Sequence, residues 1–238
     1  MKRIATAATA ALLAAAFAAP AASAATGVVS NGIAWTTHAT PDPDNPNDYC
    51  TLGAVGTDSS GNKVGISAVH CIWREPDGAT VYRWARTAAG RTPIGRLSHR
   101  GDYSTPPSGF TADWVVMQLN DDAVLTSNGP GARITGIAPA TLPSATIGCK
   151  DGITSGVTCG LITAVSTANY WNLAYVAAGD SGGPFFVNDH DWAGINFGWT
   201  TGFPGVPGAV YVRATKILSD IEAGTNPVGK GFRITNTP

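Results

Sequence analysis

The sequence predicts an all-β protein, a β-sandwich or a set of β-barrels, with one short helix near its C-terminus. Short apolar runs recur between Gly, Pro, Asn and Asp residues, and no helical periods separate them. The 238 residues include 29 glycines and 16 prolines, and 44% are apolar while only 13% are charged. These proportions fit a turn-rich globular protein and exclude a disordered polyelectrolyte, a coiled coil and a multi-span membrane protein.

Residues 1–24 have the pattern of a secretory signal peptide. Lys2 and Arg3 form a positive n-region, an Ala-rich apolar stretch runs from Ile4 to Ala19, and Ala22-Ser23-Ala24 places small residues at a cleavage site. The stretch has no stop-transfer charges after it, so we expect secretion and no stable membrane anchor. Cleavage removes two of the 15 basic residues and none of the 16 acidic ones, which makes the net charge −3. This balance argues against nucleic acid as a partner.

The four cysteines are an even number in an oxidising compartment, where disulfides are expected. Three pairings are possible, and pairing nearest neighbours gives Cys50–Cys71 and Cys149–Cys159. Each bond would close a small loop and contribute roughly 2–4 kcal/mol. A metal site built on Cys71 and His70 is the competing interpretation. No Cys-x-x-Cys or His-x-x-x-His spacing completes such a site, so we predict disulfides and no bound metal.

The predicted strands follow one another with turn residues between them. They are Thr51–Gly56, Val64–Val69, Val81–Arg86, Trp114–Leu119, Ala145–Gly148, Leu161–Val165, Phe185–Val187 and Val210–Arg213. Asp58-Ser59-Ser60-Gly61-Asn62 predicts a hairpin between the first two strands. The one predicted helix covers residues 215–223, places its apolar residues on one face and stops at Gly224. Residues 225–238 follow as a C-terminal tail.

A catalytic serine is indicated by Gly179-Asp180-Ser181-Gly182-Gly183-Pro184. Glycines on both sides of Ser181 permit a tight turn that exposes the hydroxyl and lets amide N–H groups converge on one point. An ordinary glycine-rich turn is the alternative explanation. A serine hydroxyl is a weak nucleophile near neutral pH, so it needs a base, and the base needs an orienting carboxylate.

The candidate bases are His38, His70, His99 and His190. His70 ends an apolar run and precedes Cys71, which can fix its position. Asp113 precedes the run from Trp114 to Leu119, at the start of a predicted core strand. Taken singly, His70 could be a structural histidine and Asp113 a turn residue.

Together these segments resemble the chymotrypsin-like serine proteases, in particular their bacterial, streptogrisin-type branch. Ser67–Cys71, Ala112–Val116 and Gly179–Pro184 are similar to the three catalytic blocks of that family, in the order His, Asp, Ser. Cys149–Gly160 resembles the small disulfide loop of the bacterial branch, and Pro207–Thr215 resembles the late Pro-Gly-Val-Tyr strand. The resemblance covers about residues 28–223.

The resemblance implies a protease domain at residues 25–224, made of two six-stranded antiparallel Greek-key barrels with a short C-terminal helix. Barrel one would span about residues 28–120 and barrel two about residues 132–213, with the active site between them. The implied function is that of a secreted serine endopeptidase that acts on protein or peptide substrates as a monomer, without metal or organic cofactor.

The resemblance also assigns roles to individual residues. His70 would be the general base, Asp113 would orient it, and Ser181 would be the nucleophile that forms an acyl-enzyme. The backbone N–H groups of Gly179 and Ser181 would form the oxyanion hole.

Specificity and activation depart from the family pattern. Tyr175 occupies the pocket-floor position six residues before Ser181, where trypsins have an aspartate, and Gly198 and Gly208 match small residues of the pocket walls. These residues favour an uncharged P1 side chain. Asn196-Phe197-Gly198 stands where Ser-Trp-Gly is usual.

Asp180 needs a positive partner. In animal members of the family this is a freed Ile or Val N-terminus, and residues 28–32 lie near where such a terminus would fall. No basic residue precedes Val28. Many bacterial members use an internal arginine instead, and Arg133 is the candidate that we consider.

Two other functions are compatible with these residues. A catalytically latent or non-catalytic binding protein on the same fold would be favoured by the loss of a triad member, and none is lost. The other is an esterase with the same triad but poor peptide cleavage. The α/β-hydrolase version of that chemistry needs Gly-x-Ser-x-Gly on a strand-to-helix turn. Here Ser181 is followed by Pro184 and an apolar, strand-like run.

Overall fold

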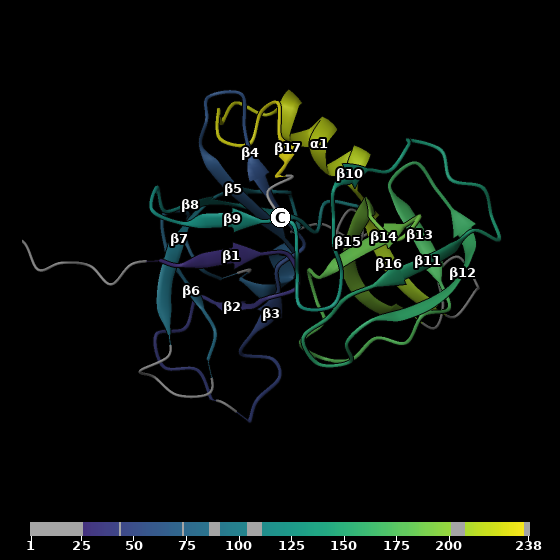
Figure 1. Ribbon diagram of the computed structural model, residues 1–238, viewed down its shortest axis with the longest axis horizontal. Helices are drawn as coiled ribbons and strands as arrows, with labels where there is room; N and C mark the ends of the chain where they lie inside the picture. Colours follow the sequence, from purple (N-terminus) through teal and green to yellow (C-terminus); the bar gives the residue numbers. More distant parts are fainter. Residues whose placement is uncertain are drawn as a thin grey trace, which may run out of the picture.

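The computed structural model describes residues 26–42, 44–72, 74–85, 91–103, 111–200 and 208–235. Two β-structured halves lie side by side, and helix α1 (Ala214–Ala223) packs at their junction (Figure 1). The predicted double-barrel fold with one short helix is confirmed. The predicted signal segment, residues 1–24, lies outside the described residues. None of the helices among the described residues is long and apolar enough to cross a membrane.

Barrel two is a closed ring of six strands, because β15 pairs with both β14 and β16. Around the ring the strands are β11 (Ile147–Lys150), β12 (Thr158–Val165), β13 (Asn169–Asn172), β16 (Gly208–Arg213), β15 (Asp191–Thr200) and β14 (Pro184–Val187). The short strand β10 (Gly136–Ile137) adds in parallel to β15. All ring pairings are antiparallel, as the family resemblance implies.

Barrel one is an eight-stranded sheet rather than a ring of six. Its order is β17 (Arg233–Ile234), β4 (Ala54–Thr57), β5 (Lys63–Ser67), β8 (Val115–Leu119), β7 (Thr92–Arg100), β6 (Thr80–Arg83), β2 (Ala34–Thr36) and β3 (Cys50–Thr51). Beside it, β1 (Val28–Ser30) and β9 (Val124–Thr126) form a parallel pair.

The chain between β3 and β4 is hydrogen-bonded to both sides of this sheet. The N–H of Leu52 donates to the carbonyl of Ile33, next to β2, while the N–H of Gly53 donates to Ile66 of β5, both at 2.9 Å. A Cβ on Gly53 would lie 2.5 Å from the carbonyl oxygen of Gly182, so only glycine fits this bend. The bend therefore lies between the β2 side and the β5 side of the sheet and approaches the serine loop of barrel two.

The two halves share a buried apolar core. Ile66 of β5 and Val116 of β8 pack in one cluster with Trp192 and Ile195 of β15. Helix α1 contributes Ile217, which is fully buried there. The apolar face predicted for residues 215–223 thus packs on the core where the two barrels meet.

The segment after the helix, which the sequence suggested to be a tail, returns to barrel one. Strand β17 pairs antiparallel with β4, and Phe232 is 7% exposed with its ring centroid 6.0 Å from that of Trp192. The N–H of Gly229 donates to the buried carboxylate of Asp58 at 3.0 Å. Through Thr235 this segment is part of the folded unit.

Candidate active site

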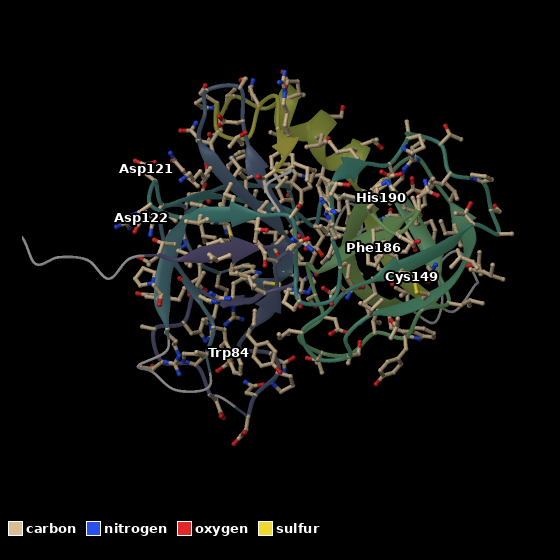
Figure 2. All side chains as sticks on the ribbon, viewed as in Figure 1. Trp84, Asp121, Asp122, Cys149, Phe186 and His190 are labelled. Carbon is tan, nitrogen blue, oxygen red and sulfur yellow. A yellow bond between two sulfur atoms is a disulfide. The ribbon has the colours of Figure 1, made fainter. Side chains whose placement is uncertain are left out.

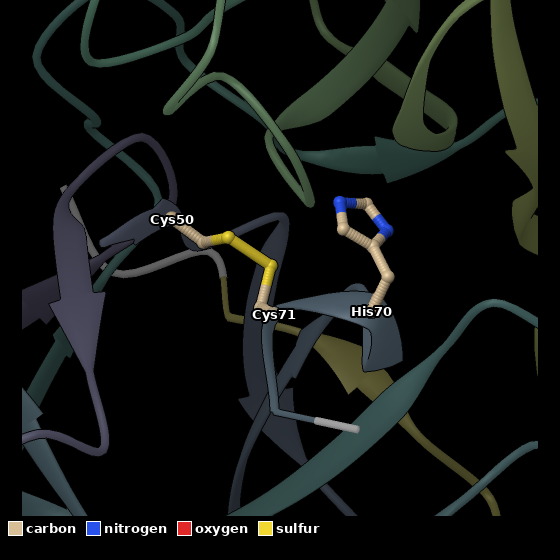
Figure 3. A group of neighbouring side chains, drawn as sticks. All are labelled: Cys50, His70 and Cys71. Carbon is tan, nitrogen blue, oxygen red and sulfur yellow. A yellow bond between two sulfur atoms is a disulfide. The ribbon is translucent and has the colours of Figure 1, made fainter. Parts of the chain in front are cut away.

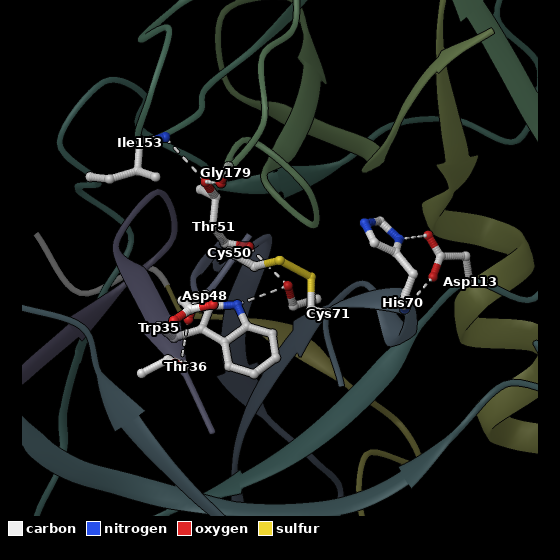
Figure 4. Close-up of a disulfide and its surroundings, with 11 residues drawn as sticks. Trp35, Thr36, Asp48, Cys50, Thr51, His70, Cys71, Asp113, Ile153 and Gly179 are labelled. Carbon is white, nitrogen blue, oxygen red and sulfur yellow. Dashed lines mark hydrogen bonds and ion pairs between the residues drawn. A yellow bond between two sulfur atoms is a disulfide. The ribbon is translucent and has the colours of Figure 1, made fainter. Parts of the chain in front are cut away.

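His70 and Asp113 are joined at the end of barrel one. His70 lies in a short 3-10 helix, Val69–Cys71, just after β5, and Asp113 lies two residues before β8. Because β5 and β8 are neighbours, their ends meet. His70 Nδ1 is 2.7 Å from Oδ2 of Asp113, and the backbone N–H of His70 donates to Oδ1 at 2.9 Å (Figure 4).

This pairing fixes the imidazole tautomer. A carboxylate accepts a hydrogen bond, so Nδ1 carries the proton and Nε2 keeps its lone pair. Burial lowers the pKa of His70, but the charge and the hydrogen bond of Asp113 outweigh burial and raise that pKa above its ordinary value. Asp113 is fully buried, which leaves His70 as the group that the cavity can reach.

Two aromatic rings flank the imidazole. Phe197 of β15, in barrel two, meets it edge-on with ring centroids 5.6 Å apart. Tyr103, which follows β7 in barrel one, has its ring centroid 6.3 Å from that of His70. The ring of His70 is therefore enclosed by both barrels, which restricts its rotation away from Asp113.

Ser181 and His70 line the same cavity, which has a volume of about 530 Å³. The cavity also borders Gly179 and the Cys50–Cys71 disulfide. No hydrogen bond joins Ser181 Oγ to His70 in this structure. Such contacts are often long in the absence of substrate and tighten in the reacting complex.

Two amide groups in the serine loop remain available to a ligand. Gly179 has φ of +94°, a conformation that favours glycine, and it lines the cavity beside Ser181. Within the described residues, neither the N–H of Gly179 nor that of Ser181 donates a hydrogen bond to the protein. Unpaired donors at one point of a cavity are what stabilisation of an oxyanion requires.

Asp180, between these two residues, is buried and paired with Lys150. Lys150 Nζ lies 2.8 Å from Oδ2 of Asp180, and both side chains are fully inaccessible to solvent. Lys150 also donates to the hydroxyl of Ser155 and to the carbonyl of Gly156. The internal cation is therefore Lys150. Arg133 is the partner that the sequence suggested. Its backbone instead forms an isolated antiparallel β-bridge with Asn128, and both residues are exposed at the surface.

The Cys149–Cys159 loop supplies most of the other partners of Asp180. The N–H groups of Thr154 and Ser155 donate to Oδ1 at 3.0 and 3.1 Å, and the Ser155 hydroxyl donates to Oδ2. Burial raises the pKa of Asp180, but the hydrogen bonds from Lys150 and Ser155 outweigh burial and lower that pKa below its ordinary value. The carboxylate is thus held charged by a loop that one disulfide closes.

The predicted specificity residues do not gather at one place. Gly198 and Gly208 lie on the paired strands β15 and β16, close to each other in the ladder. Tyr175 is 65% exposed and is absent from the residues that line the cavity. Tyr175 therefore lies outside the cavity that Ser181 and His70 line, and its place at the floor of a P1 pocket stays a prediction.

Both disulfides have the pairing predicted from the sequence, Cys50–Cys71 and Cys149–Cys159. Among the described residues, Cys50, His70 and Cys71 place potential metal-ligand atoms within 4.8 Å of one another (Figure 3). The two sulfur atoms are bonded to each other, which leaves His70 alone as a ligand. One imidazole does not make a metal site.

Two residues that sequence reasoning did not identify contribute to this arrangement. Lys150 was visible as a cation beside Cys149 in a short strand, and period-two alternation places it on the inner face when Cys149 faces outward. Thr51 gave no signal, because its role depends on a contact with Gly179 across the two halves of the molecule.

Comparison with known proteins places the fold among bacterial chymotrypsin-like serine proteases. Protease A of Thermobifida fusca aligns with a TM-score of 0.60 and 16% identity, covering 88% of this chain and 100% of that one. The chymotrypsin of Cellulomonas bogoriensis gives a TM-score of 0.59 and 20% identity, covering 88% and 100%. The Nocardiopsis protease gives 0.59 and 20%, covering 81% and 96%.

The chain matches no sequence-family model and no curated protein sequence. At these identities the structural likeness establishes the fold alone.

Proposed function

We propose that this protein is a secreted serine endopeptidase that uses His70, Asp113 and Ser181. The observation that carries the proposal is the shared cavity. The cavity is lined by Ser181, by Gly179 and by His70, whose imidazole is paired with a buried carboxylate. The N–H groups of Gly179 and Ser181 donate to no group among the described residues. The chymotrypsin-like fold supports the same chemistry.

The chain's own groups account for each step. Ser181 Oγ attacks the scissile carbonyl carbon while His70 Nε2 takes the hydroxyl proton. The resulting oxyanion is bound by the N–H groups of Gly179 and Ser181. His70 then gives its proton to the leaving amine, which leaves an ester on Ser181. Water, deprotonated by His70, hydrolyses this ester and restores the hydroxyl.

Asp113 acts through His70. Its carboxylate holds the Nδ1–H tautomer and stabilises the imidazolium that forms during both halves of the reaction. Gly198 and Gly208 remain our candidates for the walls of the P1 pocket. The signal-like pattern of residues 1–24 and the two disulfides support export to an oxidising compartment.

Intact mass after exposure to a fluorophosphonate probe tests the site. Wild type should gain one phosphonyl group as fluoride leaves, and Ser181→Ala should gain none while keeping the same thermal unfolding midpoint. Hydrolysis of a peptide substrate by wild type, but not by Ser181→Ala, would distinguish an endopeptidase from an esterase that cleaves peptides poorly. A folded wild-type protein without adduct would instead favour the latent or binding alternative. Equal hydrolysis by Ser181→Ala would refute the assignment of the nucleophile.

A further inference from the structure

Cys50 and Thr51 of barrel one connect the part of the cavity near His70 to the part near Ser181. Cys50 is bonded to Cys71, the neighbour of His70. The next residue, Thr51, is fully buried and contacts the serine loop of barrel two. Figure 4 shows this connection, with the disulfide on one side and Thr51 beside Gly179 on the other.

Thr51 contacts the serine loop at two points. Its backbone N–H donates to the carbonyl of Ser181 at 2.9 Å. Its hydroxyl donates to the carbonyl of Gly179 at 2.8 Å and accepts the N–H of Ile153 at 3.1 Å. The hydroxyl therefore ties Gly179 to the disulfide loop that also surrounds Asp180.

Thr51 is itself held in place. Its carbonyl accepts the hydroxyl of Ser67 at 2.8 Å, and Ser67 Oγ accepts the indole N–H of Trp35 at 3.0 Å (Figure 4). All three side chains are buried in barrel one. This chain of hydrogen bonds makes Thr51 a fixed point against which the serine loop can be oriented.

The hydroxyl acts on a residue whose conformation matters. Gly179 adopts φ of +94°, and its own N–H is one of the two free donors at the cavity. A glycine has more accessible backbone conformations than any other residue, so it needs outside contacts to hold one of them. A hydrogen bond on the Gly179 carbonyl constrains the torsions of that residue and hence the direction of its N–H.

We propose that Thr51 is a positioning residue of the oxyanion hole, whose hydroxyl orients Gly179 from the opposite barrel. The proposal rests on the proposed function. It adds a residue outside the triad and the serine loop to the groups that determine the rate.

Thr51→Val tests the hydroxyl at nearly constant volume. It leaves the Gly179 carbonyl and the Ile153 N–H without their partner, while the backbone contact to Ser181 stays possible. We expect kcat for peptide hydrolysis to fall about 10–100-fold, less than the roughly 10²–10³-fold cost of removing an oxyanion donor. KM should change little, since the ground state does not carry the oxyanion. Thr51→Ser keeps the hydroxyl and should restore kcat.

Thr36→Val is the matched control. Thr36 is also buried in barrel one, and its hydroxyl also bonds one backbone carbonyl, of Asp48, and one backbone N–H, of His38. Thr36→Val should lose about as much thermal stability as Thr51→Val but keep the wild-type kcat per titrated active site. If Thr51→Val keeps that kcat too, the proposal is wrong and the hydroxyl is only structural.

A readout independent of activity separates this proposal from the proposed function. The amide resonance of Gly179 should shift in Thr51→Val and stay near its wild-type position in Thr51→Ser and Thr36→Val. An unchanged Gly179 resonance in folded Thr51→Val overturns the proposal whatever the activity. A shifted resonance in a chain whose wild type never reacts with fluorophosphonate would contradict the proposed function but leave the contact established.

Discussion

The ammonium of Lys150 lies 2.8 Å from the carboxylate of Asp180, and neither side chain is exposed to solvent. Two buried charges of this kind are costly to remove from water and are stable only when paired and hydrogen-bonded. Asp180 stands between Gly179 and Ser181, which both line the cavity. The pair therefore holds the serine loop through an internal cation, Lys150.

Replacing Lys150 by Met should destabilise both the fold and the oxyanion hole. The substitution leaves the Asp180 carboxylate buried without its cation, which typically costs about 3–5 kcal/mol of unfolding free energy. Gly179 and Ser181 lose their fixed orientation, so kcat per folded molecule should fall by up to about 10²–10³-fold. Denaturant unfolding and active-site-titrated kinetics measure the two effects separately.

Lys150→Arg is the charge-conserving control and should retain much more activity than Lys150→Met. Arg133→Met should leave both quantities unchanged, because Arg133 lies near Asn128 at the surface. An active Lys150→Met protein would show that Asp180 does not depend on this cation.

Activity should fall on the acid side of a pH profile at a pKa above 6.5, the ordinary value for histidine. Only neutral His70 can accept the Ser181 proton, and Asp113 raises the pKa of His70 by favouring its charged form. Activity is therefore lost as pH falls through this raised value. The pH dependence of kcat/KM, which reports the free enzyme, gives the apparent pKa directly.

Asp113→Asn supplies the control for this assignment. Without the carboxylate charge, the acid limb should move to lower pH in whatever activity remains. A limb that stays in place in Asp113→Asn would mean that a group other than His70 controls it.

The motifs of the sequence identified the residues that the structure brings together, His70 with Asp113 and Ser181 with His70 at one cavity, better than the contacts that surround them. His70, Asp113 and Ser181 lie in short motifs that are readable along the chain when the three are taken together. The partner of Asp180 depends on which strands become neighbours. Lys150 is opposite Phe185 in the pairing of β11 with β14, a relationship that no spacing along the chain reveals.

For the fold, too, local sequence patterns predicted some elements and failed for others. Strand β16 and helix α1 were predicted from apolar runs, whereas β7 was missed because Pro93, Gly95 and its charged residues have the composition of a loop. Tyr175 was placed by counting back from Ser181, but its carbonyl accepts the hydroxyl of Thr158 and its side chain faces solvent. Counting residues cannot foresee the course of a loop.

Phe232→Ala should destabilise the protein by about 3–5 kcal/mol, the range for removing a buried aromatic side chain. Phe232 packs in the core between the barrels near Trp192, so its loss leaves a cavity there. Arg233→Ala is the control and should have little effect, since Arg233 is exposed on β17. Equal unfolding midpoints for wild type and Phe232→Ala would show that residues 225–235 do not contribute to the core.

The final prediction concerns the amino terminus. Thr26 is 3% exposed, and its N–H and hydroxyl both donate to the carboxylate of Asp122, at 2.9 and 2.6 Å. Figure 2 shows Asp122 and Cys149, the neighbour of Lys150, on opposite sides of the molecule. A terminus anchored at Thr26 therefore lies far from Asp180. Val28, the candidate for a new terminus, is 48% exposed but is paired with Val124 of β9 in the β1–β9 ladder.

We accordingly expect the secreted protein to begin at Ala25 and to need no further cleavage for activity. Adding a short Gly-Ser extension before Ala25 should leave kcat unchanged, because Lys150 already neutralises Asp180. N-terminal sequencing of the secreted protein identifies its first residue, and the kinetics of the extended form show whether a free terminus is needed for activity. Loss of activity in a folded, extended protein would instead indicate that a free terminus is required, as in enzymes that are activated by insertion of their N-terminus.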